Sequence, residues 1–250
     1  MEKVKDSKLV GKEIQNKMSW TDKAAVKHIC ELRDIFKVNT LVETGTFKGI
    51  TAKLQSGNFK KVLTCELVKE YYDASIKKLK DNPNVSVFHM DSSEFITDFI
   101  KRYKREGRTD YILFFLDAHF YDPQLKPEDR FVVLKELKAL KDFNKAIIVV
   151  HDFDNNLGHI TYDGQPLDLE LMQEDLLKVN PNFKFYTNEL GSCDIVTKQE
   201  VIDGEVDGLE PDFPTLDNLE YLWATPRLTY RGLLYCTPND IIVNGLRKWK

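Results

Sequence analysis

The segment TLVETGTFKGITA (residues 40–52) begins with a short β-branched run, continues through a turn with two glycines and ends in a segment compatible with a helix. Glu43 lies near the end of the run, and Gly45 and Gly49 permit a tight turn. Such a turn lets the backbone approach a ligand closely and points the N–H groups of the following helix at it. We therefore predict that a strand–loop–helix unit opens the fold and binds a ligand.

Short runs of β-branched and aromatic residues continue to alternate with longer amphipathic stretches after this unit, which predicts a parallel sheet with helices on both faces. The predicted strands are residues 40–44, 62–67, 85–90, 111–117 and 146–150. The predicted helices are residues 49–57, 69–80, 93–104, 128–142 and 167–179. The pattern then changes, because residues 183–189 and 194–197 are two strand-like runs close enough for an antiparallel hairpin. We predict an α/β, Rossmann-like open sheet of five parallel strands that ends in this hairpin.

The 250 residues are expected to form one domain with extensions at both ends. Residues 1–38 are predicted to be an N-terminal extension with a helix at about 23–36, residues 39–198 the core, and residues 199–250 a C-terminal extension. The C-terminal extension could form a lid, a wall of the substrate site or the contact of a homodimer.

Composition excludes several classes of protein. A net charge of −4 disfavours an extended surface for nucleic acid, and the ordinary 42% of hydrophobic residues argues against disorder. The four cysteines form no CxxC pair, which is typical of reduced thiols. No apolar run approaches the roughly 20 residues that span a bilayer, and the polar N-terminus is unlike a signal peptide. We expect a cytoplasmic protein.

Two further acids are spaced as an adenosyl ligand requires. Glu66 follows Gly45 by 21 residues at the end of the second strand, where a carboxylate can accept from both ribose hydroxyls. The turn has the form GxxxG and lacks the glycine of GxGxxG at which backbone crowds a pyrophosphate, which favours S-adenosylmethionine over NAD. Asp91, after the third strand, could accept from the adenine amine or simply cap a helix.

The motifs ETGTFKG, CEL, MDS, FLDAH and VVHDF together resemble class I S-adenosylmethionine-dependent methyltransferases, and most closely the metal-dependent sugar O-methyltransferases of the macrocin O-methyltransferase type. The resemblance covers residues 38–197. It implies that Glu66 holds the ribose and that the remaining cofactor contacts come from Glu43, Gly45, Thr46, Gly49, Asp91 and Ser92. The family frequently has two adjacent acids after the fifth strand, whereas this chain has His151 and Asp152.

Acids and histidines follow the fourth and fifth strands, whose carboxyl ends face the ligand crevice of an open parallel sheet. Methyl transfer to a hydroxyl needs alignment and removal of a proton, for which a histidine or a divalent cation is suited. We hypothesise that His119 or His151 is the base and that Asp117 and Asp152 bind Mg²⁺ or Mn²⁺. Asp117 could instead contact the methionine end of the cofactor.

The loop after Asp152 is rich in hydrogen-bonding side chains, which suits a sugar or glycan hydroxyl as acceptor, although a solvated surface loop would have the same composition. It carries Asp154, Asn155, Asn156, His159, Tyr162, Asp163 and Gln165. Other functions stay open on the same fold. These are a different transferase or lyase that uses S-adenosylmethionine, and a non-catalytic binding protein; an NAD-dependent dehydrogenase is disfavoured.

Overall fold

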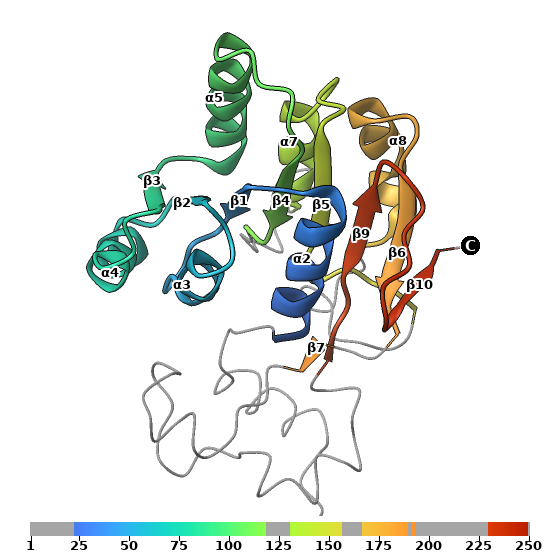
Figure 1. Ribbon diagram of the computed structural model, residues 1–250, viewed down its shortest axis with the longest axis horizontal. Coiled ribbons are helices and arrows are strands. Elements are labelled where there is room, and N and C mark those ends of the chain that lie inside the picture. Colours follow the sequence, from blue (N-terminus) through green and yellow to red (C-terminus); the bar gives the residue numbers. More distant parts are fainter. Residues whose placement is uncertain (1–22, 119–130, 157–166, 190–191, 194–229, 250) are drawn as a thin grey trace, which may run out of the picture.

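The computed structural model describes residues 23–118, 131–156, 167–189, 192–193 and 230–249 (Figure 1). Its first half alternates helix and strand: α2 (Lys23–Phe36), β1 (Thr40–Thr44), α3 (Ile50–Ser56), β2 (Lys61–Glu66), α4 (Lys69–Leu79), β3 (Val85–His89), α5 (Ser92–Arg105), β4 (Ile112–Leu116), α7 (Val132–Ala139) and β5 (Ala146–Val150). The second half contains α8 (Leu169–Val179), β6 (Lys184–Asn188), β7 (Ser192–Cys193), β8 (Tyr230–Arg231), β9 (Leu234–Thr237) and β10 (Leu246–Lys248).

The main sheet has the strand order β10-β6-β9-β5-β4-β1-β2-β3. Strands β1 to β5 are parallel. The chain builds the sheet outward from β1 through β2 to β3, and then returns to place β4 and β5 on the other side of β1. Strand β9 then runs antiparallel between β5 and β6. The predicted fold class, a Rossmann-like sheet of parallel strands closed by antiparallel C-terminal strands, is confirmed.

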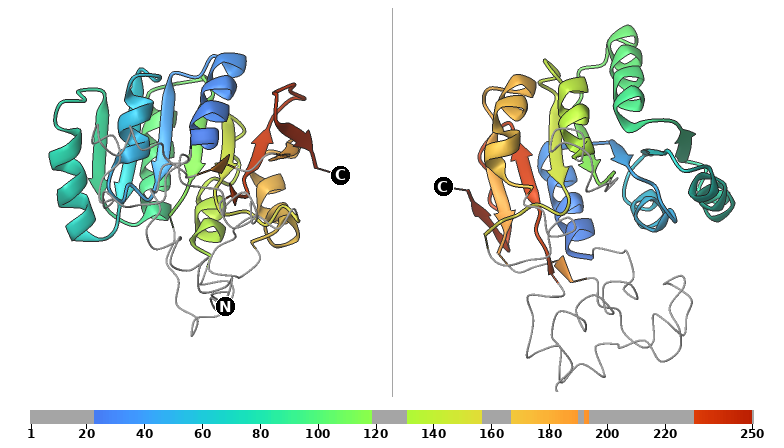
Figure 2. Two further views of the ribbon diagram at one scale, coloured as in Figure 1. Left: turned by 90° about the horizontal axis from the view of Figure 1, so that it is seen from below. Right: turned by 180° about the vertical axis from the view of Figure 1, so that it is seen from behind.

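Helices cover both faces of this sheet, as the views in Figure 2 show. Helices α5, α7 and α8 pack on one face through residues such as Phe95, Leu137 and Met172, and α2, α3 and α4 pack on the other. Successive strand residues face opposite sides, so Phe114 lies in the first core and Phe115 in the second. This two-sided burial explains why β1, β4 and β5 are buried along their whole length, and why β4 and β5 read as continuous apolar runs.

The predicted hairpin is the part of the sheet that we placed wrongly. Strand β6 pairs with β9, and its other edge pairs with β10, both from beyond residue 198. The two predicted runs are close in sequence, but the four fully buried residues of β9 suit the position between two other strands. Residues 194–197 lie outside the described residues, and Ser192–Cys193 pairs with β8 in a separate small sheet. The boundary predicted at residue 198 therefore cuts through the main sheet.

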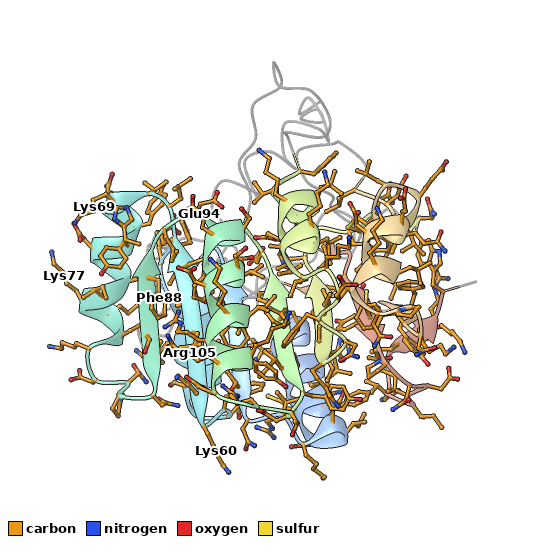
Figure 3. All side chains as sticks on the ribbon, turned by 90° about the horizontal axis from the view of Figure 1, so that it is seen from above. Lys60, Lys69, Lys77, Phe88, Glu94 and Arg105 are labelled. Carbon is orange, nitrogen blue, oxygen red and sulfur yellow. The ribbon has the colours of Figure 1, made fainter. Side chains whose placement is uncertain are left out.

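Basic side chains lie on the outer faces of the helices. Lys69 and Lys77 project from the outer side of α4, and Arg105 lies at the end of α5 (Figure 3). Both lysines and the arginine are exposed. None of the helices within the described ranges is long and apolar enough to cross a membrane.

Candidate functional site

The turn between β1 and α3 is pressed against the end of β4. Gly45 has φ +80°, and a Cβ there would lie 2.7 Å from the carbonyl oxygen of Asp117. Gly49 has φ +72°, precedes α3, and donates its N–H to the carbonyl of Thr46 at 2.7 Å. Both glycines thus occupy left-handed positions that favour glycine, and the first also permits close approach of two backbones. The carboxyl ends of β1 and β4 are brought together at this point.

Glu66 holds the turn from the end of β2. Its Oε2 accepts the N–H of Phe47 and its Oε1 accepts that of Val68, both at 2.8 Å. Phe47 has φ +46°, an uncommon conformation for a residue with a side chain, and its ring packs edge-on against Tyr71. Each carboxylate oxygen retains a second acceptor site, so these bonds are compatible with contact to a ribose hydroxyl.

Glu43 ends a buried chain of hydroxyl groups. Thr64 Oγ1 donates to Glu43 Oε2 at 2.6 Å, and Thr46 Oγ1 lies 2.6 Å from Thr64 Oγ1. Burial raises the pKa of Glu43 to about 8; the hydrogen bond from Thr64 lowers it, and the neighbouring Asp117 and Glu66 raise it further. A positive ligand group at this edge would relieve the repulsion among these acids. Thr46 was predicted as a site residue, whereas Thr64 was missed, although a polar side chain within an apolar strand is a signal for it.

Asp91 caps α5. Its Oδ1 accepts from Ser93 N at 2.8 Å, Ser93 Oγ at 2.6 Å and Glu94 N at 3.2 Å. Burial opposes ionisation of Asp91, but these hydrogen bonds outweigh it and lower the pKa of the carboxyl. The capping role that the sequence left open is therefore present. Among the described residues nothing hydrogen-bonds the hydroxyl of Ser92, which is buried at the crevice end of β3.

His151 lies between the two predicted acids. Its Nδ1 is 2.9 Å from Asp117 Oδ1 and 3.4 Å from Asp152 Oδ1. The side chains of His151 and Asp152 are only 8% and 5% exposed, whereas that of Asp117 is 26% exposed, so Asp117 is the acid best placed to meet a ligand. The imidazole also packs edge-on against Phe115. A histidine beside two carboxylates can accept a proton from a hydroxyl, because the negative charges stabilise the imidazolium that forms.

A cation site at Asp117 and Asp152 finds little support in the donors. Within the described part of the chain, no group of three His, Cys, Asp or Glu side chains could hold a metal ion. Asp152 is almost fully buried, and its backbone has φ +56°. Among the described residues, Asp117 and Asp152 therefore lack a third side-chain ligand of these types.

Several predicted residues lie outside the described ranges, namely His119 and the loop residues His159, Tyr162, Asp163 and Gln165. Asn155, which we expected to suit an acceptor, is fully buried. Its amide donates to the carbonyl of Asn188 at 3.2 Å, because the loop turns back onto β6 after β5. That expectation is corrected for Asn155. Asn188 was missed, since its partners come from segments far apart in the sequence.

Three solved structures illustrate what this chain is similar to. An O-methyltransferase from Bacillus cereus, in complex with S-adenosylhomocysteine, is 13% identical, with a TM-score of 0.51 over 94% of this chain and 92% of that one. A SAM-dependent methyltransferase from Anabaena variabilis is 14% identical, covering 90% of this chain and 89% of that one, with a TM-score of 0.49. TomG, an O-methyltransferase from Streptomyces achromogenes involved in tomaymycin synthesis and solved with SAM, is 12% identical, covering 88% and 82%, with a TM-score of 0.49.

The comparisons establish the fold of this chain and not its family. No family model matches the sequence, and no curated protein matches it. The similarity to the Bacillus cereus enzyme shows a common fold. The class defined here is thus a protein with an open Rossmann-like sheet, a glycine turn and an acidic crevice edge.

Proposed function

We propose that this protein is an S-adenosylmethionine-dependent methyltransferase that methylates a hydroxyl of a sugar or another small polar acceptor. The observation that carries the proposal is the glycine turn folded onto an acidic edge made by Glu43, Glu66 and Asp117. Such an edge complements a ligand with a positive sulfur and a positive amino group. A pyrophosphate would instead add negative charge beside these acids.

In this proposal Glu66 binds the ribose, and Asp91 with Ser92 binds the adenine. The second carboxylate oxygen of Asp91 and the buried hydroxyl of Ser92 are the groups that we assign to the adenine on that side. Glu43, Gly45, Thr46, Gly49 and Asp117 line the ribose and methionine side.

His151 removes the proton of the acceptor hydroxyl. When bound, S-adenosylmethionine supplies a methyl group on a positive sulfur and departs as S-adenosylhomocysteine. In this proposal Nε2 is the ring atom that takes the acceptor proton, and the Asp117 carboxylate, 2.9 Å from Nδ1, stabilises the resulting imidazolium by its charge. His119 remains an alternative base.

We propose His151, and not Mg²⁺ or Mn²⁺, as the group that activates the hydroxyl, which departs from the metal-dependent macrocin type that the sequence resembles. Dialysis against a chelator is expected to leave methyl transfer unchanged, whereas His151→Gln should lower kcat by about 10²–10⁴-fold. Loss of activity on chelation, restored by Mg²⁺, would instead support a cation at Asp117 and Asp152.

Titration calorimetry with S-adenosylhomocysteine tests cofactor binding. Glu66→Gln should weaken binding at least about tenfold, because losing one charge-assisted hydrogen bond costs about 1.5–3 kcal/mol. Glu70→Gln, an exposed acid on α4, is the matched control and should bind as the wild type does. Absence of heat with both S-adenosylmethionine and S-adenosylhomocysteine would favour a non-catalytic protein, and tight binding of NAD would overturn the assignment.

Product analysis separates the reactions that share this cofactor. S-adenosylhomocysteine together with a methylated sugar or alcohol is the expected result. Methylthioadenosine would point to transfer of another part of the cofactor or to lyase chemistry.

A further inference from the structure

The segment that follows His151 and Asp152 is hydrogen-bonded to the C-terminal strands and to the residues between them. Phe153 donates its N–H to the carbonyl of Gly232 at 2.9 Å, and a Cβ on Gly232 would lie only 1.9 Å from the carbonyl oxygen of Phe153. The two backbones therefore meet at a point where a side chain cannot fit. Strands β5, β9 and β6, which meet here, lie side by side in Figure 1.

Asn188, at the end of β6, is the centre of this contact. Its Oδ1 accepts the N–H of Leu233 at 2.8 Å and lies 3.4 Å from the amide nitrogen of Asn155, which also donates to the Asn188 carbonyl at 3.2 Å. Arg247 of β10 donates to the carbonyl of Asn155 at 3.3 Å. Asn155 and Asn188 are both fully buried, so breaking their contact leaves polar groups in the protein interior.

The hydrogen-bonded segment begins directly after a strained residue. Asp152 is buried and has φ +56°, and such conformations persist where the surroundings impose them. Hydrogen bonds from Phe153 and Asp154 to Gly232 and Leu167 follow immediately. The turn that carries His151 and Asp152 is thus held from the C-terminal side by contacts that do not involve the glycine turn.

We propose that Asn188 is a positioning residue, which acts through Asn155 to keep His151 beside Asp117. This inference rests on the proposed role of His151 as base. Loss of the contact should loosen the histidine and leave intact the part of the proposed cofactor site that follows β1, β2 and β3, with Glu66 and Asp91.

The test compares Asn188→Ala and Asn155→Ala with Asn180→Ala. Asn180 is also buried and joins the beginning of β6 to Asn144, next to the beginning of β5, through a bond of 3.3 Å, so it is a matched control at the opposite end of the same strands. The Asn188 and Asn155 variants should lower kcat at least about tenfold, shift the pH profile of kcat, and change the affinity for S-adenosylhomocysteine by less than about twofold. Because the two residues act through one contact, kcat of the double variant should be little lower than kcat of either single variant. Asn180→Ala should lower thermal stability with an unchanged pH profile.

A second readout does not depend on activity. In histidine-¹⁵N-labelled protein, the imidazole signals of His151, assigned with His151→Gln, should move in Asn188→Ala and stay in place in Asn180→Ala. Unchanged signals in folded Asn188→Ala would overturn the positioning role, even if methyl transfer is established. Moved signals in a protein that transfers no methyl group would support the contact and refute the proposed function instead. Equal shifts in both variants would mean a general effect of stability and would also overturn the proposal.

Discussion

At the scale of single residues, Gly45 is the position where the backbone leaves no room for a side chain. Gly45→Ala combines φ +80° with a Cβ 2.7 Å from the Asp117 carbonyl. We expect a loss of about 1–3 kcal/mol in the free energy of unfolding from the backbone strain alone, and weaker binding of S-adenosylhomocysteine because the turn must move. Urea unfolding and calorimetry measure the two effects.

The control for this change is Gly57→Ala. Gly57 has φ −74° at the end of α3, and a Cβ there would meet nothing within 4 Å. The variant should unfold like the wild type and bind with unchanged affinity. Equal losses at both glycines would contradict the close approach of the turn to β4.

Glu43 predicts a dependence of stability on pH. Its pKa is about 8 in the folded protein and about 4.5 as the ordinary value, so the folded state holds a proton that the unfolded state releases. The stabilisation by this proton is complete below pH 4.5 and is lost as the pH rises through about 8. The slope approaches about −1.4 kcal/mol per pH unit between these values.

Glu43→Gln should remove that slope, because the amide keeps an acceptor for Thr64 and does not ionise. Urea unfolding at pH 5 and pH 8 is expected to show that the free energy of unfolding decreases less between these pH values for this variant than for the wild type. Glu70→Gln, on the exposed side of α4, should retain the wild-type slope. A variant with the same slope as the wild type would show that another group is responsible.

At the scale of the elements, Asp91 caps α5 and is also the residue that we propose for the adenine contact. Asp91→Ala removes the cap and should cost about 1 kcal/mol. Because hydrogen bonding lowers its pKa, that stabilisation is present above the ordinary value of 3.8 and is lost as the pH falls through the lower folded value. Asp91→Ser keeps a cap but lacks the second carboxylate oxygen. Relative to Asp91→Ala it should therefore restore stability without restoring the affinity for S-adenosylhomocysteine. Full affinity in Asp91→Ser would restrict Asp91 to capping.

At the scale of the whole molecule, the C-terminal strands complete the central sheet. A chain ending at residue 229 lacks β9, whose residues Leu234, Tyr235 and Cys236 are completely buried between β5 and β6. We expect it to lose cooperative unfolding, as followed by circular dichroism in urea. A chain ending at residue 244 lacks the edge strand β10 and should still unfold cooperatively at a lower urea concentration. Cooperative unfolding of the shorter chain would mean that the core ends near residue 198 after all.

The sequence by itself determined the part of the fold that depends on local patterns. The alternation of apolar runs and amphipathic segments predicted β1 and β5 to the residue. For β5 the reason is that a strand buried on both faces is continuous in hydrophobicity. The two glycines predicted the turn, since their left-handed conformations are a property of single residues. The position of His151 and Asp117 at neighbouring strand ends followed from the rule that parallel strands end at one edge.

The tertiary structure alone decided which strand closes the sheet and what holds the turn that carries His151 and Asp152. The partner of β6 is β9 and not the adjacent run, because burial between two strands outweighs closeness in sequence. Asn155 appeared to be a group for the acceptor, but its contact with Asn188 places it in the interior. A local sequence pattern shows which residues are apolar and which can form a turn. Which polar groups far apart in the sequence form hydrogen bonds depends on the positions that they take in the completed sheet.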